Sequence, residues 1–164
     1  KAFTNLKRQH IKSFKYDIYG SGPELNDLIE YSERNDLAEN INFKGMIARN
    51  EVLRAIPNYD VVIMPSLSEG LSLAAIEAQM LAKPLICSDI ASFKEIITEG
   101  YNGLLFSNND VEDLVRKLVF ITRNRSLINE LSFNSRNRYL QKFELGVTAR
   151  RYLNVYLQVQ SEKN

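Results

Sequence analysis

The stretch DVVIMPSLSEGLSLAAIEAQMLA, residues 60–82, decides the fold. It opens with the continuous apolar run Asp60–Met64, which is typical of a strand covered on both faces. The loop Pro65–Gly70 follows, and the residues from Leu71 to about Ala82 have a helical pattern. A strand buried on both sides, a brief loop and a helix form the repeating unit of an α/β domain with a parallel sheet.

The same alternation recurs on both sides of this unit. We expect further strands at 14–19, 41–45, 84–88 and 103–106. Helices are expected up to Ile11 and over 24–35, 50–55, 92–98 and 111–123, with helix starts at Pro23, Asn50 and either Asn109 or Asp110. From Ser126 to 164 the sequence predicts a helical C-terminal tail, with helices at 126–139 and 145–159. The predicted fold class is therefore α/β: a Rossmann-like doubly wound parallel sheet with helices on both faces and a helical C-terminal tail.

Composition limits the classes of function. The 164 residues have the length of one domain, and 45% hydrophobic with 25% charged residues is ordinary globular usage. A net charge of +1 argues against nucleic acid as a partner. The sequence contains no apolar stretch long enough for a membrane span and no signal peptide. The single Cys87 and single His10 exclude an internal disulfide, disfavour a metal site and fit a cytoplasmic compartment.

Ligands of open α/β sheets bind beyond the carboxyl ends of the strands, which selects the loops 20–24, 45–48, 65–72, 88–92 and 106–110. Glu69 and Glu77 stand at i and i+8, so on one helix they would lie about 12 Å apart along the axis and about 80° apart around it. They cannot form a close acid/base pair but could hold two parts of an extended ligand. Between them, the amides of residues 70–73 could bind a phosphate at the helix start, and Gly70 permits a close backbone approach. The spacing leaves a second interpretation open, in which Glu69 merely favours a helix N-terminus and Glu77 is a solvated helix residue.

SEGLSLAAIEA at 68–78 resembles the E-x7-E motif of the family 4 (group 1) retaining glycosyltransferases, in the nucleotide-sugar-binding C-terminal domain of their GT-B fold. GSGPE at 20–24, INFKG at 41–45, AKPLI at 82–86 and EIITEGYNGLL at 95–105 resemble other segments of that domain in the same order. Phe143 and Tyr156 match aromatic positions of its tail. The resemblance covers nearly the whole chain.

The resemblance implies a role for each matching residue. Glu77 would bind the ribose hydroxyls of the nucleotide, and Glu69 would contact the donor sugar as the catalytic residue. The implied substrate-binding residues around them lie at the helix start (Ser68, Gly70, Leu71, Ser72 and Leu73), in the loop that frames the base (Gly45, Met46 and Ile47) and beside the phosphates (Gly20, Ser21 and Gly22).

The implied reaction transfers a hexose from a nucleoside-diphosphate sugar, a UDP-sugar first of all, to a saccharide or lipid-linked acceptor with retention at the anomeric carbon. Transfer on one face, with the leaving phosphate helping to deprotonate the acceptor, needs no protein nucleophile. No cofactor and no metal are expected. Catalysis would then rest on positioning and on electrostatic stabilisation of the diphosphate. Two other functions stay open: a sugar-nucleotide epimerase of GT-B fold, and a nucleotide-sugar binding module without catalysis.

The sequence departs from the family pattern at three places. Position 72 is Ser where many members have Gly, and Ala91-Ser92 replaces a Gly-Gly pair. The family's opening strand, with its phosphate-binding cations, and the N-terminal acceptor domain would precede Lys1. We therefore expect an inactive fragment, the donor-binding domain over 1–164, whose strands at 15–19 and 60–64 flank a missing strand. The outcomes considered are a gap, a repaired pairing or a strand swapped from another copy.

Lesser candidates have simpler explanations. His10 is expected to be a solvated helix residue, and Cys87 a small buried hydrophobe rather than a nucleophile. Arginines 123, 125, 136, 138, 150 and 151 are expected to form a solvated face, with peripheral contact to the inner face of the membrane as a secondary interpretation. Tyr152 and Tyr156 are expected to pack rather than to bind a ligand, and could dock on the N-terminal domain.

Overall fold

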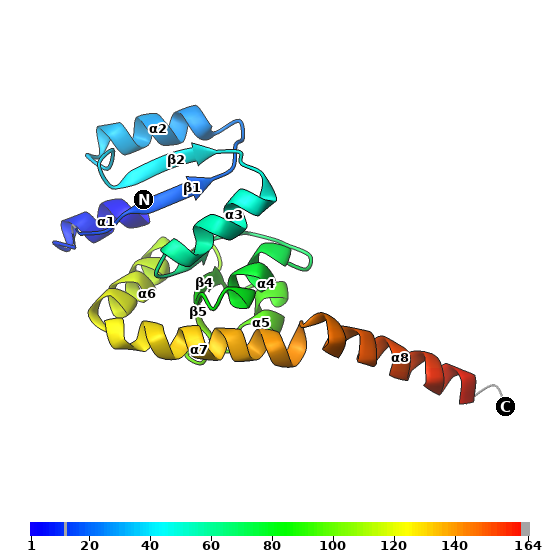
Figure 1. The fold of residues 1–164 in the computed structure, drawn as a ribbon. Coiled ribbons are helices and arrows are strands. Elements are labelled where there is room, and N and C mark those ends of the chain that lie inside the picture. The colour runs from blue at the N-terminus through cyan, green and yellow to red at the C-terminus, as the bar shows by residue number, and fades with distance from the viewer. Residues whose placement is uncertain (12, 162–164) are drawn as a thin grey trace.

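The computed structural model describes residues 1–11 and 13–161 and confirms the α/β class with helices on both faces of a parallel sheet (Figure 1). The strands in this part of the chain are β1 (Tyr16–Tyr19), β2 (Ile41–Gly45), β3 (Val62–Met64), β4 (Leu85–Ser88) and β5 (Gly103–Phe106). The helices are α1 (Ala2–Arg8), α2 (Leu25–Arg34), α3 (Arg49–Ala55), the 3-10 turn η1 (Ile56–Asn58), α4 (Leu73–Met80), α5 (Ala91–Ile96), α6 (Val111–Arg123), α7 (Arg125–Lys142) and α8 (Leu145–Ser161).

The strands form two parallel sheets instead of one. β1 pairs with β2, with Tyr16 opposite Ile41. β3, β4 and β5 pair in that order, with Val62 opposite Leu85 and Leu85 opposite Gly103. β1 and β3 face each other across a cavity of about 1240 Å³ that every residue of both strands lines. The order β2, β1, cavity, β3, β4, β5 is the predicted doubly wound order with its first strand left out.

Direct pairing of β1 with β3, one of the three expected outcomes, is wrong, because no pair of the described residues joins them. Within the single chain a gap lies between the two strands, and a strand swapped from another copy stays a prediction. The Tyr16 N–H donates to the segment before β2, and the Val62 N–H donates to the segment before β4. Since successive amides of a strand point to opposite sides, those of Asp17, Tyr19 and Ile63 point into the cavity. We call this cavity, with β1 and β3 as its two walls, the strand slot.

Side chains bridge the slot. Tyr59, just before β3, donates its hydroxyl to Asp17 Oδ2 of β1 at 2.6 Å, and the Tyr19 hydroxyl lies 2.6 Å from the same Tyr59 oxygen. Burial and the hydrogen bond to Asp17 raise the pKa of Tyr59 well above its usual value, so the phenol stays a donor. These contacts attach the β1–β2 sheet to the rest of the domain without strand pairing.

Both faces of the β3–β4–β5 sheet are buried, as the apolar run at 60–64 predicts. On one face Ile86 and Leu104 pack with residues of α1 and α6. On the other face Leu85 and Cys87 pack with residues of α4 and with Phe93 of α5. Strand β4 is therefore enclosed on both faces and along both edges, and it carries the centre of the domain.

One predicted helix cap is wrong. Helix α3 begins at Arg49 with Ala48 as its N-cap residue, so Asn50 lies inside the helix. The Ala48 N–H donates to the Glu51 carboxylate at 3.0 Å, which supplies one half of a capping box from within the first turn. With that hydrogen bond in place, the helix does not need an asparagine cap.

Other helix starts agree in part. Asp110 caps α6 by accepting the Asp113 N–H at 2.9 Å, which confirms one of the two predicted caps. Helix α2 begins at Leu25, so Pro23 precedes the helix instead of starting it. Helix α1 ends at Arg8 and leaves Ile11 outside, although Ile11 still packs against the α1–α6 core.

The predicted tail consists of two unlike parts. Helix α7 packs on α4, with Leu131 buried and the Ser135 hydroxyl donating to the Lys83 carbonyl at 2.8 Å. Helix α8 has no buried residue and extends away from the body of the domain, with Tyr152 and Tyr156 exposed (Figure 1). Residues 162–164 of the predicted tail lie outside the described residues. The two tyrosines therefore do not pack within residues 1–11 and 13–161.

The arginines do not form one solvated face. Arg136 and Arg138 are half-buried and donate to the carbonyls of Met80 and Glu95, near the ends of α4 and α5. Free carbonyls at helix ends attract such cations, and the sequence did not show that α7 runs past them. Arg125 remains exposed and pairs with Asp60 at 3.2 Å. Within the described part of the chain, no helix has the length and apolar character that a membrane span needs.

Helix α4 ends in a Schellman motif. The Lys83 N–H donates to the Ala78 carbonyl at 2.9 Å, and the Ala82 N–H donates to the Gln79 carbonyl at 3.0 Å. Ala82 occupies the left-handed position of the motif with φ +57°. Glycine is the usual residue there, because a Cβ is strained in this conformation.

We expect Ala82→Gly to raise the free energy of unfolding by about 0.5–1 kcal/mol, because it removes the left-handed strain at a smaller cost in unfolded-chain entropy. The matched control is Ala55→Gly at the end of α3, where φ is −78° and the same change should cost about 1 kcal/mol. Urea unfolding midpoints measure both. An Ala82→Gly protein no more stable than the parent would show that this alanine is unstrained.

We also expect the slot amides of Asp17, Tyr19 and Ile63 to exchange with solvent deuterium much faster than their neighbours Ile18 and Val62, because only the neighbours donate within a sheet. Native-state hydrogen exchange followed by NMR measures this. Protection of all five amides that rises with protein concentration would mean that a strand from another copy fills the slot. Protection independent of concentration would mean that β1 and β3 pair directly.

Candidate functional site

Two glycine turns shape one edge of the candidate site at the carboxyl ends of β1 and β2. Gly20 has φ +127° and Gly45 has φ +67°, conformations that favour glycine. The Gly20 N–H donates to the Gly45 carbonyl at 2.8 Å, which ties the two turns together. Beyond them, Met46 is 77% exposed and presents its side chain at the mouth of the slot. These turns are where the sequence predicted the phosphate and base loops.

Glu77 lies on the second turn of α4 and is not a solvated helix residue, since its side chain is only 15% exposed. Arg49 of α3 donates its Nε to Glu77 Oε1 at 2.6 Å, and its Nη2 contacts the same oxygen. Among the described residues nothing donates to Oε2. The carboxylate therefore keeps one oxygen free beside the cavity. Sequence reasoning missed Arg49, which lies 28 positions away and belongs to no motif.

Glu69 has a different setting. It precedes α4, which begins at Leu73 and not at Leu71 as predicted, and it accepts a hydrogen bond from the Ser66 hydroxyl at 2.6 Å. Its side chain is exposed and does not line the slot. Glu69 and Glu77 thus stand on a loop and a helix with separate partners. This arrangement suits contacts to two parts of one ligand.

The start of α4 offers unused donors. The first intrahelical hydrogen bond runs from Ile76 N–H to the Ser72 carbonyl, so among the described residues the amides of residues 73–75 have no acceptor. Ser72, the N-cap residue, is buried and turns its hydroxyl toward Met64 Sδ at 3.9 Å instead of capping the helix. At Gly70 a Cβ would meet nothing within 4 Å. The helix start is therefore open to an anion from solvent.

Hydrogen bonds between loops hold the segment that carries Glu69. The hydroxyl of Ser88, the last residue of β4, donates to the Ser66 carbonyl, and Asn108 Nδ2 after β5 donates to the Leu67 carbonyl at 3.2 Å. The Asn108 N–H also donates to Asp89 at 2.9 Å and lowers the pKa of that carboxyl. Asn108 was not among the predicted site residues. Its only sequence signal is its position in the predicted loop 106–110.

The slot brings some predicted residues together and leaves others apart. Gly20, Met46, Ile47 and Glu77 line it, in company with Ala74 of α4. The residues that lie outside its lining belong to the turn after β1, the end of β2, the loop before α4 and the first residue of α4: Ser21, Gly22, Gly45, Ser68, Glu69, Gly70, Leu71, Ser72 and Leu73. The carboxyl end of the slot is thus a mouth between the base loop and α4.

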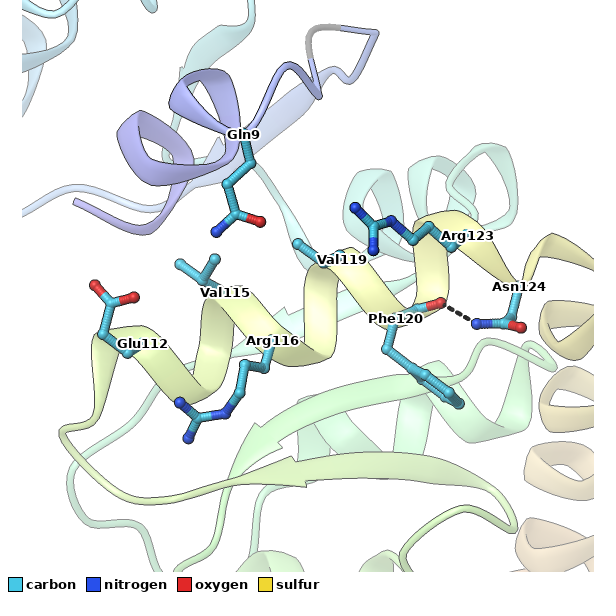
Figure 2. Close-up of a pocket in the computed structure, with 8 residues that line it drawn as sticks. All are labelled: Gln9, Glu112, Val115, Arg116, Val119, Phe120, Arg123 and Asn124. Carbon is cyan, nitrogen blue, oxygen red and sulfur yellow. Dashed lines mark hydrogen bonds between the residues drawn. The ribbon is translucent and has the colours of Figure 1, made fainter.

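A second cavity, of about 420 Å³, lies between α1 and α6 and contains no predicted site residue. Figure 2 shows its lining, in which Gln9, the residue after α1, faces Val115 and Val119 across the groove while Arg123 lies at one end. The Asn124 side chain closes the same end of α6 by donating to the Phe120 carbonyl at 2.8 Å. This groove is separate from the edge where the strands end.

The two lone reactive side chains stand apart from the site chemistry. Cys87 is fully buried, and burial, with a smaller effect of the Glu69 charge, raises the pKa of its thiol far above the usual value. The prediction of a buried hydrophobe is confirmed. His10 is exposed, as predicted, but it lies in the turn after α1 with φ +62° and not in the helix.

Comparison with known proteins settles the family. The profile described as "Glycosyl transferases group 1" matches residues 1–138. The chain belongs to the glycosyl transferases group 1 family. The predicted resemblance is therefore confirmed, and so is the GT-B type of fold.

Individual relatives of this glycosyl transferase chain agree. It is 30% identical over 128 residues to the Escherichia coli enzyme UDP-Gal:alpha-D-GlcNAc-diphosphoundecaprenol alpha-1,3-galactosyltransferase, covering 78% of this chain and 33% of that protein. The structure superposes with a TM-score of 0.83 on Anabaena HepE in complex with UDP, at 18% identity, over 96% of this chain and 44% of HepE. It superposes with a TM-score of 0.77 on the C-terminal domain of the group 1 protein LpcC from Francisella tularensis, at 23% identity, over 88% of this chain and 76% of the LpcC chain. The chain spans about a third of the length of the curated relatives it matches.

Proposed function

We propose that this chain is the donor-binding half of a retaining glycosyltransferase that transfers a hexose from a UDP-sugar to a saccharide or lipid-linked acceptor. One observation carries the proposal: the half-buried Glu77 keeps a free carboxylate oxygen beside an uncapped helix start, at the carboxyl edge of a parallel sheet. The relatives support it, since the Escherichia coli enzyme is named for UDP-Gal and HepE was solved with UDP.

The donor would lie along this edge. Its base would rest on the loop at Met46 and Ile47, and its ribose hydroxyls would donate to Glu77 Oε2. The diphosphate would accept from the free amides at the start of α4, where the helix dipole also favours negative charge. The sugar would then face the loop that carries Glu69.

The chemistry follows from this placement. The bond from the anomeric carbon to the diphosphate breaks while the acceptor hydroxyl attacks the same face, and the acceptor proton passes to the departing phosphate oxygen. The chain's contribution is to hold the diphosphate at the helix start and the sugar beside Glu69. Cys87, buried and protonated, takes no part.

We also propose that residues 1–164 act only together with an acceptor-binding domain, and that one further strand completes the sheet. The slot supports the strand: its two walls are parallel strands whose inward amides have no partner in the described residues. An added strand would pair with both and stand between two covered faces. In a longer chain that contains this strand, the amides of Asp17, Tyr19 and Ile63 should be protected from hydrogen exchange. Rapid exchange of these amides in such a chain would contradict the added strand.

The ribose contact predicts that Glu77→Ala weakens UDP binding about ten- to hundredfold, as expected for the loss of hydrogen bonds to a charged group. Isothermal titration of the protein with UDP measures the loss. Glu130→Ala serves as the control, because Glu130 is exposed on α7 and its side chain makes no hydrogen bond or ion pair in the described residues. Equal UDP affinity in the parent and the Glu77 variant would contradict a donor site at this edge of the sheet.

The sugar contact predicts a different pattern for Glu69→Ala. UDP affinity should stay within about twofold, whereas the gain in affinity from UDP to UDP-glucose should disappear, because Glu69 reaches only the sugar. Titration with UDP, UDP-glucose and GDP-mannose compares the ligands. Joined to its acceptor domain, the parent should transfer sugar. Binding without transfer would indicate a nucleotide-sugar binding module. Inversion of a stereocentre in the sugar of a free nucleotide sugar would indicate an epimerase.

A further inference from the structure

Arg49 connects the two elements between which a nucleoside would lie. It stands in the first turn of α3, directly after the loop 45–48, and its guanidinium reaches Glu77 on α4. The Nε-to-Oε1 distance is 2.6 Å, and Nη2 contacts the same oxygen. Both nitrogens thus hold one oxygen of the carboxylate from the solvent side.

We propose that Arg49 is a positioning residue that sets Glu77 for binding the ribose diol of a nucleoside diphosphate. The inference rests on the proposed function, since it concerns the same site. A base and its ribose are joined by one bond, so the loop that holds the base and the carboxylate that holds the ribose must keep a fixed spacing. The Arg49–Glu77 contact is what links α3, which extends that loop, to α4.

The geometry also fixes the orientation of the carboxylate. Arg49 contacts Oε1, and among the described residues no hydrogen bond or ion pair uses Oε2. Glu77 on its own would sample several rotamers, and a ligand would have to select one of them at an entropic cost. Holding the side chain in advance lowers that cost.

Charge gives Arg49 a second effect. A carboxylate and a diphosphate within one site repel each other, and the repulsion is strongest where water is partly excluded. The guanidinium beside Glu77 offsets the carboxylate charge without occupying the oxygen that faces the ligand. The Glu77 carboxylate can then accept hydrogen bonds from the ribose although the helix start that would bind the diphosphate is close by.

The contact contributes little to the fold. Arg49 is 74% exposed, and exposed ion pairs add little to stability. Arg54 lies on the same helix, is exposed, and its side chain makes no hydrogen bond or ion pair in the described residues. It therefore offers a matched control for the loss of one positive charge from α3.

The test compares UDP with 2′,3′-dideoxy-UDP in isothermal titrations of the parent, Arg49→Ala, Arg49→Lys and Arg54→Ala. We expect Arg49→Ala to weaken UDP binding about tenfold and the dideoxy ligand only about threefold, because the dideoxy ligand loses the charge offset alone, so that discrimination between them falls. Arg54→Ala should change neither ligand. Arg49→Lys should recover only part of the discrimination, because an ammonium cannot present the paired nitrogens of arginine. The double variant Arg49→Ala with Glu77→Ala should bind UDP no worse than Glu77→Ala alone.

Three results would overturn the positioning role: unchanged discrimination in Arg49→Ala, equal weakening of both ligands, or additive losses in the double variant. Should Arg49→Ala fail to fold, Arg49→Lys with full discrimination would overturn it as well. The proposed function fails in another way, when the parent does not bind UDP or when Glu77→Ala binds it normally. The two failures are therefore distinguishable within one set of titrations.

Discussion

The structure depends on the enclosure of β4 within a parallel sheet. Its four residues are buried, pair on both edges, and pack on helices above and below. The fit with β5 is close enough that a Cβ on Gly103 would lie 2.6 Å from the Leu85 carbonyl oxygen, so only glycine serves there. Fixing β4 fixes β3 and β5, and with them the loops after Met64, Ser88 and Phe106 that meet at one edge.

That shared edge explains how an exposed loop is held in place. The loop with Glu69 has no secondary structure of its own, yet hydrogen bonds from Ser88 and Asn108 attach it to the end of β4 and to the loop after β5. Glu77 is held in another way, by its helix and by Arg49. The site thus joins a part supported by the rigid sheet to a part supported by a single ion pair.

Much of the fold could be predicted from the sequence because it rests on local patterns. The strands Ile41–Gly45 and Gly103–Phe106 have the predicted bounds, and the Asp110 cap follows from its own first turn. The site loops followed from the rule for parallel sheets, whereas Arg49 did not. Contacts such as Arg49 with Glu77, Tyr59 with Asp17 and Arg136 with Met80 join residues 28, 42 and 56 positions apart. No sequence periodicity predicts these contacts, because they depend on which elements lie side by side in the folded domain.

Helix α8 has a consequence for how this chain unfolds. It has no buried residue and makes few contacts with any element other than α7, so the core adds almost nothing to its stability. We therefore expect α8 to unfold independently of the core. The helix content of the chain and the packing of its core therefore follow different unfolding transitions. A two-state fit to the loss of helix content would give a wrong free energy of unfolding for the core. The apolar side chains from Tyr152 to Val159 meanwhile stay exposed to water in the folded domain, so burying them in a partner would add stability that the domain itself does not have.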